Sequence, residues 1–135
     1  MLRERRAATV LTPHDGEFER LAGGPPGFDR FAAARRLAAA TGAVVLLKGP
    51  TTLVAEPAGF VRAVTTGDQR LASAGTGDVL AGTIGALLAS GMAPFDAAAA
   101  GAWLHGTAAS LQPAAGLVAG DVAAAIPRAI ELIAE

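Results

Sequence analysis

The chain has 135 residues, a formal net charge of −1 and 52% apolar residues. This length fits one domain, and the near-zero charge gives no long-range attraction toward nucleic acid or an anionic membrane. Cysteine is absent, which excludes disulfides and thiolate metal sites, and no apolar stretch reaches the ~20 residues that a bilayer span needs. We therefore expect a cytoplasmic protein.

The first half predicts strand, helix, helix and strand in chain order. Residues 7–11 read as a short buried strand that ends at Thr12-Pro13, and acidic residues in the first turn mark the short helix after it. A second helix is predicted from Phe28 to Thr41. The continuous apolar run over 43–47 predicts a strand covered on both faces.

The second half predicts a hairpin followed by three helices. Two segments rich in β-branched residues, 51–55 and 59–64, flank a turn. Helices are expected from the glycine-rich segment near residue 75 to about Ser90, and over 95–110. Asp121 is placed to cap a last helix to Ile133, with Pro127 interrupting or kinking it. Strands that alternate with helices predict one α/β domain over residues 1–135, with a mixed sheet.

The sharpest chemical signal is the segment Gly75-Thr76-Gly77-Asp78 at a helix start. Two glycines let the backbone curl and leave its amides uncovered, which suits a phosphate together with the helix dipole. The carboxylate of Asp78 can accept backbone hydrogen bonds or act as a base toward a substrate hydroxyl. An ordinary helix start with glycines for packing explains this pattern equally well.

A second signal is Lys48-Gly49-Pro50-Thr51-Thr52 at the end of the second buried strand. Open α/β sheets bind ligands at the carboxyl ends of their strands, where the ammonium of Lys48 can meet a phosphate and Gly49 allows close approach. Considered alone, a lysine at this place more often only extends into water.

Histidine follows the first strand as well, in the segment Thr12-Pro13-His14. His14 is suited to donate to a ligand or to shuttle a proton, although a helix-entry residue bonded to a carboxylate is the simpler reading. For His105, inside a predicted helix, we expect a structural role. The chain shows no histidine–glutamate spacing typical of a metal site.

These signals coincide at strand ends. Three predicted strand ends carry, in turn, His14, Lys48 and the Gly75–Asp78 turn. In a doubly wound sheet such ends share one rim. One cleft would then contain a base, a cation and an anion-binding turn.

Three segments together resemble the ADP-dependent NAD(P)H-hydrate dehydratase family, which belongs to the ribokinase-like superfamily. They are VLTPHDGEFERL at 10–21, VVLLKGPTTLV at 44–54 and ASAGTGDVLAGTIGALLASG at 72–91, and WLHG at 103–106 also resembles a later helix of that family. The resemblance implies a ribokinase-like three-layer α/β/α fold. This chain would be a partial domain, the carboxy-terminal portion, with a mostly parallel sheet plus a β-hairpin.

The resemblance also implies a reaction. The family removes water from the S epimer of hydrated NADH or NADPH, coupled to hydrolysis of ADP or ATP, with Mg²⁺ as the expected counter-ion. By position, Asp78 would be the catalytic base and would contact the hydrated cofactor together with His14. The remaining matches would contact the nucleotide: Lys48, Gly49, Pro50, Thr51, Thr52, Gly75, Thr76 and Gly77.

Two departures from the family stand out. Asp15 replaces the usual proline and puts a negative charge next to His14, and the chain has roughly half the family's length. Exposed strand edges left by that difference favour a homo-oligomer. Two alternatives remain open: a ribokinase-like kinase for a vitamin precursor, which would use the same Asp78, and a non-catalytic nucleotide-binding fragment.

Overall fold

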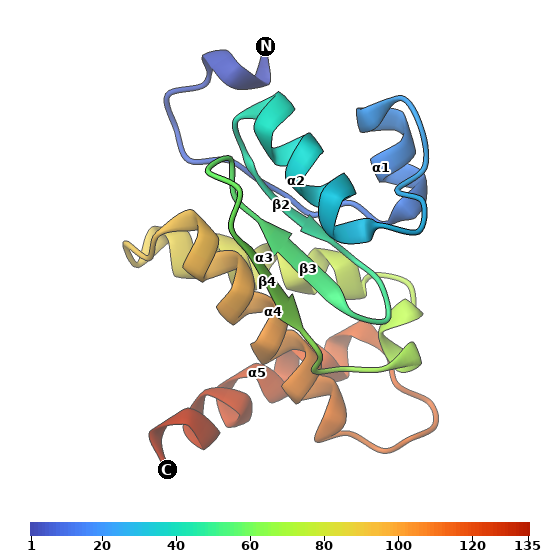
Figure 1. The fold of residues 1–135 in the computed structure, drawn as a ribbon. Coiled ribbons are helices and arrows are strands. Elements are labelled where there is room, and N and C mark those ends of the chain that lie inside the picture. The colour runs from blue at the N-terminus through green and yellow to red at the C-terminus, as the bar shows by residue number, and fades with distance from the viewer.

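The structure is a computed structural model that describes residues 1–135. Its elements alternate as the sequence predicts (Figure 1). In chain order they are η1 (Leu2–Glu4), β1 (Val10–Leu11), α1 (Asp15–Ala22), α2 (Arg30–Thr41), β2 (Val44–Leu47), β3 (Thr52–Ala55), β4 (Val61–Val64), η2 (Gln69–Ala72), α3 (Thr76–Ala89), α4 (Pro94–Ser110) and α5 (Ala119–Ala134).

The four strands form one sheet in the order β1-β2-β3-β4. Val10 and Leu11 pair in parallel with β2, and the predicted hairpin forms between β3 and β4. The α/β class, the mixed sheet and the hairpin are confirmed. Strands β1, β2 and β4 run in one direction, whereas the short turn after Leu47 returns β3 antiparallel to β2.

The sheet lies between two helical layers, so the three-layer arrangement is confirmed (Figure 1). Alternate residues of a strand face opposite sides. On one face, Val45 and Leu47 pack with Phe18 of α1 and with α2. On the other face, Val44 and Leu46 pack with α3 and α4. Strand β2 is therefore buried throughout, as its continuous apolar run predicts.

A third core joins α5 to α4, away from the sheet, and includes Leu104 and Val122. Helix α5 begins at Ala119, and Asp121 lies in its first turn, where its carboxylate accepts the amide of Val118. Asp121 is thus part of the capping arrangement but is not the first capping residue. Of the two effects expected of Pro127, the interruption is wrong, because the helix continues past this residue to Ala134.

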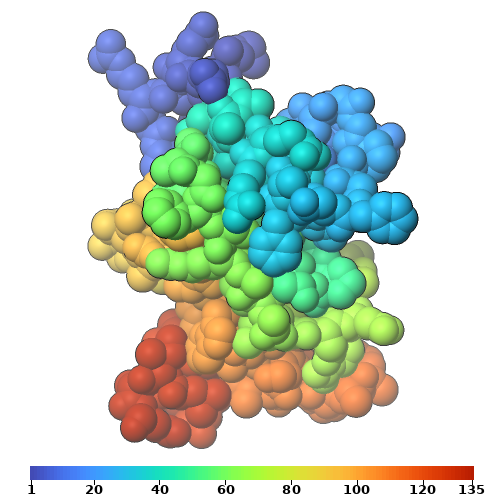
Figure 2. Space-filling view, viewed as in Figure 1, coloured from blue at the N-terminus to red at the C-terminus, as the bar shows by residue number.

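Alanine supplies 12 of the 24 buried apolar residues. This composition lets the helices approach the sheet and each other closely. The amino-terminal segment and α5 lie at opposite ends of the molecule (Figure 2). No helix combines the length and apolar character that crossing a membrane requires.

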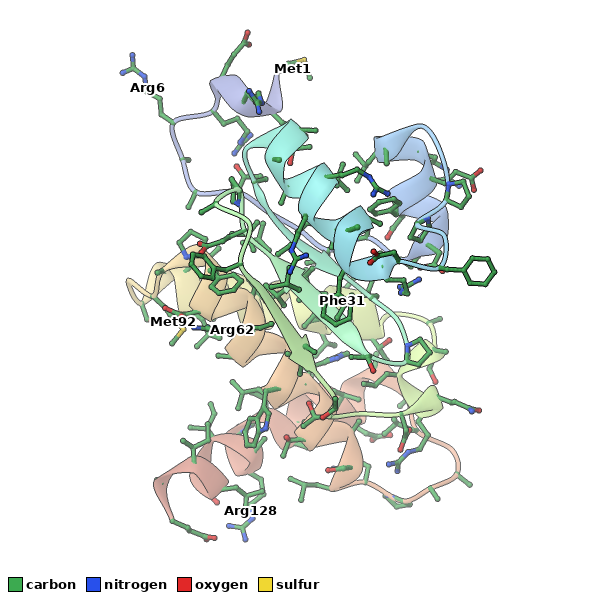
Figure 3. The ribbon with its side chains drawn as sticks, in the orientation of Figure 1. Met1, Arg6, Phe31, Arg62, Met92 and Arg128 are labelled. Atoms are coloured by element: carbon green, nitrogen blue, oxygen red, sulfur yellow. The ribbon has the colours of Figure 1, made fainter.

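Two local boundaries differ from the predicted ones. Strand β1 has two residues instead of five, because only Val10 and Leu11 find partners on β2 and nothing pairs with their other edge. Helix α2 begins after Asp29, whose carboxylate accepts the amide of Ala32 at 2.9 Å. Phe28 therefore lies outside the helix and is fully exposed. Phe31 on α2 is also partly exposed, and Figure 3 shows it in front of the sheet.

Candidate functional site

The site begins where the loops after β1 and β2 meet. These strands are parallel, so their carboxyl ends share one rim. The amide of Lys48 donates to the carbonyl of Pro13 at 2.9 Å, which ties the two loops together. His14 and Lys48, predicted from separate segments, consequently lie on adjacent loops.

His14 begins helix α1. Its Nδ1 accepts the amide of Glu17 at 3.2 Å, and its own amide donates to Oε2 of Glu17 at 2.9 Å. This reciprocal pair is a capping box with histidine in the first position. Because Nδ1 accepts a hydrogen bond, the neutral ring carries its proton on Nε2. The side chain is 57% exposed, so Nε2–H can donate to a ligand on the rim.

Glu17 connects His14 to Lys48, although it is not among the residues predicted for the site. Its Oε2 lies 3.4 Å from Nζ of Lys48. The amide of His14 and, after it, the positive charge of Lys48 hold the pKa of Glu17 below its usual value. The signal was present in the sequence as an acidic residue three positions after the capping residue.

The ammonium of Lys48 reaches the glycine-rich turn. A methyl group added at Gly77 would lie 3.5 Å from Nζ of Lys48. The lysine side chain is 28% exposed and is thus held between α1 and the first turn of α3. The structure therefore brings together His14, Lys48 and the Gly75–Asp78 turn. The β2–β3 turn, η2 and the start of α3 gather at one end of the sheet in Figure 1.

The glycine turn presents free amides. The amides of Gly75 and Gly77 donate no backbone hydrogen bond, whereas Asp78 and Val79 donate to the carbonyl of Gly75. Gly75 has φ +85° and ψ −12°, a left-handed conformation that favours glycine. Two amides without hydrogen-bond partners at a helix start, next to an ammonium group, have the chemical character that suits an anion. Asp78 is exposed in the same turn.

Two buried polar residues support the turn from below. Thr76 is 3% exposed, and its hydroxyl donates to the carbonyls of Leu71 and Ser73. His105 of α4 is also buried, and its Nε2 lies 2.8 Å from the carbonyl of Thr76. A carbonyl only accepts, so Nε2 carries the proton. Burial, followed by the nearby charge of Lys48, lowers the pKa of His105 and keeps the ring neutral. His105 therefore has the structural role expected for it, and that role is to hold the backbone of the glycine turn at Thr76.

Arg30 supports the loop after β2 and was missing from the predicted site. Its Nη2 donates to the carbonyl of Lys48 at 2.8 Å, while Nη1 donates to both carboxylate oxygens of Asp15 at 2.8 and 3.0 Å. The negative charge that the sequence places next to His14 is thus engaged by Arg30. Gly49 leaves room for this guanidinium, because an added methyl group would lie 2.7 Å from Nη2 of Arg30 and would displace it from these contacts.

The other residues predicted to contact the nucleotide share this loop. Pro50 is exposed and Thr51 is half-buried. Thr52 begins β3, opposite Val64. These three residues follow Lys48 in the turn between β2 and β3 and at the start of β3.

The donors available for a metal ion are few. No group of three or more histidine, aspartate and glutamate side chains lies close enough to hold one. A hard cation such as Mg²⁺ needs about six oxygen ligands. The residues present fit a magnesium ion that arrives with nucleotide phosphates, since the chain itself offers only isolated carboxylates such as Glu17 and Asp78.

Comparison with known proteins identifies relatives along nearly the whole chain. A family model described as NAD(P)H-hydrate dehydratase matches residues 2–131. The bifunctional NAD(P)H-hydrate repair enzyme Nnr of Mycobacterium tuberculosis is 60% identical over 95 residues, which are 70% of this chain and 20% of that protein. The ADP-dependent (S)-NAD(P)H-hydrate dehydratase of Neisseria meningitidis is 50% identical over 124 residues, covering 86% of this chain and 42% of the relative.

Solved structures agree with this relationship. The ADP/ATP-dependent NAD(P)H-hydrate dehydratase of Bacillus subtilis, co-crystallized with ATP/Mg²⁺, superposes with a TM-score of 0.89 at 34% identity. The match covers 96% of this chain and 49% of that one. A ribokinase-like superfamily protein of Enterococcus faecalis gives a TM-score of 0.73 at 30% identity. This chain thus spans about half the length of the solved relatives, and less than half that of the curated ones. By its sequence, its fold and the residues gathered on its rim, the chain belongs to the NAD(P)H-hydrate dehydratase family.

Proposed function

We propose that this chain takes part in the nucleotide-dependent dehydration of the S epimer of hydrated NADH or NADPH. The single observation that supports this most is the position of the Lys48 ammonium against Gly77, at a helix start with free amides. A terminal phosphoryl group is the kind of ligand that such a place binds. The relatives named above carry out NAD(P)H-hydrate repair, and one is ADP-dependent by name.

The nucleotide side of the proposed site comprises Lys48 to Thr52 and Gly75 to Gly77. Lys48 neutralises phosphate charge, and the amides of Gly75 and Gly77 donate to the terminal phosphoryl oxygens. ADP or ATP is the proposed nucleotide. Mg²⁺ bound to its phosphates would offset their negative charge and orient them.

The substrate side comprises His14 and Asp78. Asp78 accepts the proton of the added hydroxyl, whose oxygen attacks the terminal phosphorus while the bond to the departing nucleotide breaks. The glycine amides stabilise the charge on the transferred group. The carbon–oxygen bond then breaks and phosphate leaves with the electron pair, while the neighbouring ring carbon gives up a proton to the departing phosphate and its C–H electron pair forms the double bond. Nε2–H of His14 donates to the hydrated cofactor.

We also propose a cytoplasmic location and self-association. The support for self-association is the outward face of α3, where the small residues Ala81, Gly82, Gly85 and Ala86 are exposed next to the unpaired edge of β1. An uncharged helix face of this kind is typical of an interface. Light scattering of the purified chain over a concentration series tests this, and a monomer at all concentrations would contradict it.

The function is tested by incubating the purified chain with hydrated NADH and with ADP or ATP. We expect NADH to be regenerated, followed by its absorbance. Asp78→Asn should lower turnover by about 10²- to 10⁴-fold and leave the Kd for ADP within about threefold. Asp96→Asn is the matched control, since Asp96 is also the third residue of an exposed helix start.

Each alternative predicts a different result in the same experiment. Phosphorylation of a thiazole or pyrimidine alcohol without regeneration of NADH would support the kinase. Binding of ADP without turnover of any of these substrates would support the non-catalytic fragment. Equal turnover in Asp78→Asn and the unchanged chain would contradict the role proposed for Asp78.

A further inference from the structure

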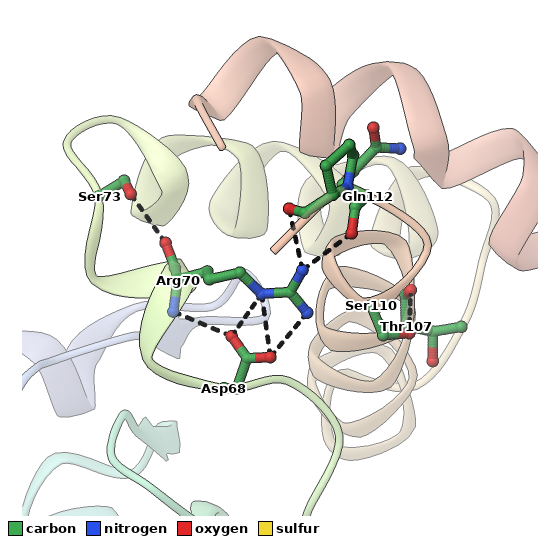
Figure 4. Close-up of polar contacts among 7 residues, drawn as sticks. Asp68, Arg70, Ser73, Thr107, Ser110 and Gln112 are labelled. Carbon is green, nitrogen blue, oxygen red and sulfur yellow. Dashed lines mark hydrogen bonds and ion pairs between the residues drawn. The ribbon is translucent and has the colours of Figure 1, made fainter. Parts of the chain in front are cut away.

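The segment that leads into the glycine turn is attached to the loop between α4 and α5. Arg70 of η2 extends across the gap, and its Nη1 donates to the carbonyls of Gln112 and Pro113 at 2.9 and 3.2 Å (Figure 4). These contacts join residues more than forty positions apart in the sequence. They attach the segment that precedes the glycine turn to the residues that follow α4.

The rest of the Arg70 side chain is occupied by Asp68. Nε donates to both carboxylate oxygens at 2.9 and 3.0 Å, and Nη2 donates to Oδ2 at 2.7 Å. Asp68 also accepts the amide of Arg70. These hydrogen bonds lower the pKa of Asp68 to about 2, so its carboxylate is charged at neutral pH. The guanidinium is thus fixed in one orientation, with a fork that a lysine cannot reproduce.

Two further contacts continue the attachment toward the turn. The hydroxyl of Ser73 lies 3.4 Å from the carbonyl of Leu117, although its shorter bond is to Arg70. A methyl group added at Gly75 would lie 3.2 Å from Cβ of Ala119. Residues 68–75 and 112–119 therefore run side by side, and Arg70 makes the strongest link between them.

From this geometry we infer that Arg70 is a positioning residue that couples the glycine turn to the α4–α5 loop. Its side chain is engaged by Asp68 and by the carbonyls of Gln112 and Pro113, so in this role it acts through the backbone and not by contact with a ligand. It holds the backbone before Gly75, so that the free amides of the turn keep the spacing an anion needs. An anion bound at the turn then also orders residues 112–118. The part concerning a bound ligand rests on the proposed function.

Preorganisation is the physical reason for such a role. An anion bound only by backbone amides depends on their directions, and ordering a loose turn at the moment of binding costs affinity. Residues 111–118 make few buried contacts of their own, with only Gln112 and Leu117 partly covered. Without Arg70, both segments would open independently.

Amide hydrogen exchange of the full chain tests the coupling. We compare the unchanged chain, Arg70→Ala and Arg70→Lys, each with and without ADP. Arg62→Ala is the matched control, because Arg62 also pairs with an aspartate but lies on β4, over the ring of Phe95 (Figure 3). Circular dichroism establishes that each variant is folded. If Arg70→Ala does not fold, the comparison uses Arg70→Lys, which retains the positive charge.

Without ligand, we expect Arg70→Ala to speed exchange about tenfold in both 68–77 and 112–118, and Arg70→Lys to do so by a smaller factor. Arg62→Ala should change neither segment. With ADP, the unchanged chain should gain protection in both segments, and Arg70→Ala should weaken the Kd by about three- to tenfold. Faster exchange in 68–77 alone, or equal effects of the Arg70 and Arg62 variants, would overturn the coupling.

The two proposals fail in different ways. If the unchanged chain does not bind ADP, the proposed function fails, while the ligand-free exchange still decides whether Arg70 couples the two segments. If ADP binds but protects only the turn, the function stands and the inference about the loop is overturned.

Discussion

Thr76 and Asp78 lie two residues apart in the same helical turn, but the chain holds them in opposite ways. Thr76 is buried, its hydroxyl donates to two carbonyls, and its own carbonyl accepts from His105. Asp78 is exposed, as is His14 across the rim. The part of the rim proposed for the nucleotide is therefore built before any ligand arrives. The part proposed for the hydrated cofactor is open to solvent in this chain.

This contrast explains how a chain half as long as its solved relatives can retain a defined anion site. The polar groups that hold the glycine turn in its conformation all come from residues 68–119 of this chain. Binding of nucleotide and turnover of substrate should thus respond differently to substitution, and the following variants test that difference.

The largest effect on nucleotide binding is expected for Lys48→Met. It removes the ammonium beside Gly77 while keeping an unbranched apolar stem. A hydrogen bond to a charged group contributes roughly 1.5–3 kcal/mol, so the Kd for ADP should rise by about ten- to a hundredfold. Titration calorimetry measures this. His14→Ala serves as the comparison and should leave the Kd within about twofold, and an equal loss in both variants would remove the distinction between the two sides.

A smaller effect is expected for Gly75→Ala. The left-handed backbone at φ +85° and the 3.2 Å approach to Cβ of Ala119 both oppose a side chain there. The free energy of unfolding should fall by about 1–2 kcal/mol, measured by urea denaturation. Gly24→Ala is the control, since nothing lies within 4 Å of its added methyl group. Equal free energies of unfolding for Gly75→Ala and Gly24→Ala would show that neither the backbone conformation nor the space at Gly75 requires glycine.

The smallest effect is expected in the pH dependence of stability through His105. Its pKa is lowered in the folded chain, chiefly by burial, so the unfolded chain binds more protons near pH 6. Stability should therefore fall as the pH drops from about 6.5 through the lower folded value. His105→Gln retains a donor for the carbonyl of Thr76 but does not titrate. Denaturation at several pH values should give a flatter profile for this variant, and parallel profiles would contradict the assignment.

Much of the fold could be predicted because its signals are local. The apolar run of β2, the hairpin and the helices near 30–41, 76–89 and 94–110 follow from periodicity and from glycine and proline at their ends. The convergence of His14 and Lys48 followed from the rule that parallel strands share a rim. Their proposed roles in binding remain predictions.

The missed features depend on contacts between distant segments. Arg30 reaches a carbonyl 18 positions away, and Arg70 reaches one 42 positions away. In the sequence each is an ordinary arginine of a helix or loop. Glu17 is different, since the capping-box spacing could have indicated it.

The alanine-rich core has a consequence for mutational scanning. Half of the buried apolar positions already carry the residue to which an alanine scan would change them, so such a scan would leave half of this interior untested. Enlargement would show the opposite. A methyl group at Gly101 would lie 2.5 Å from Cγ1 of Ile84, at the crossing of α3 and α4. At such buried positions, substitutions are thus limited by the largest side chain that fits. Variant libraries intended to stabilise the protein should change surface charges and loops before they enlarge core residues.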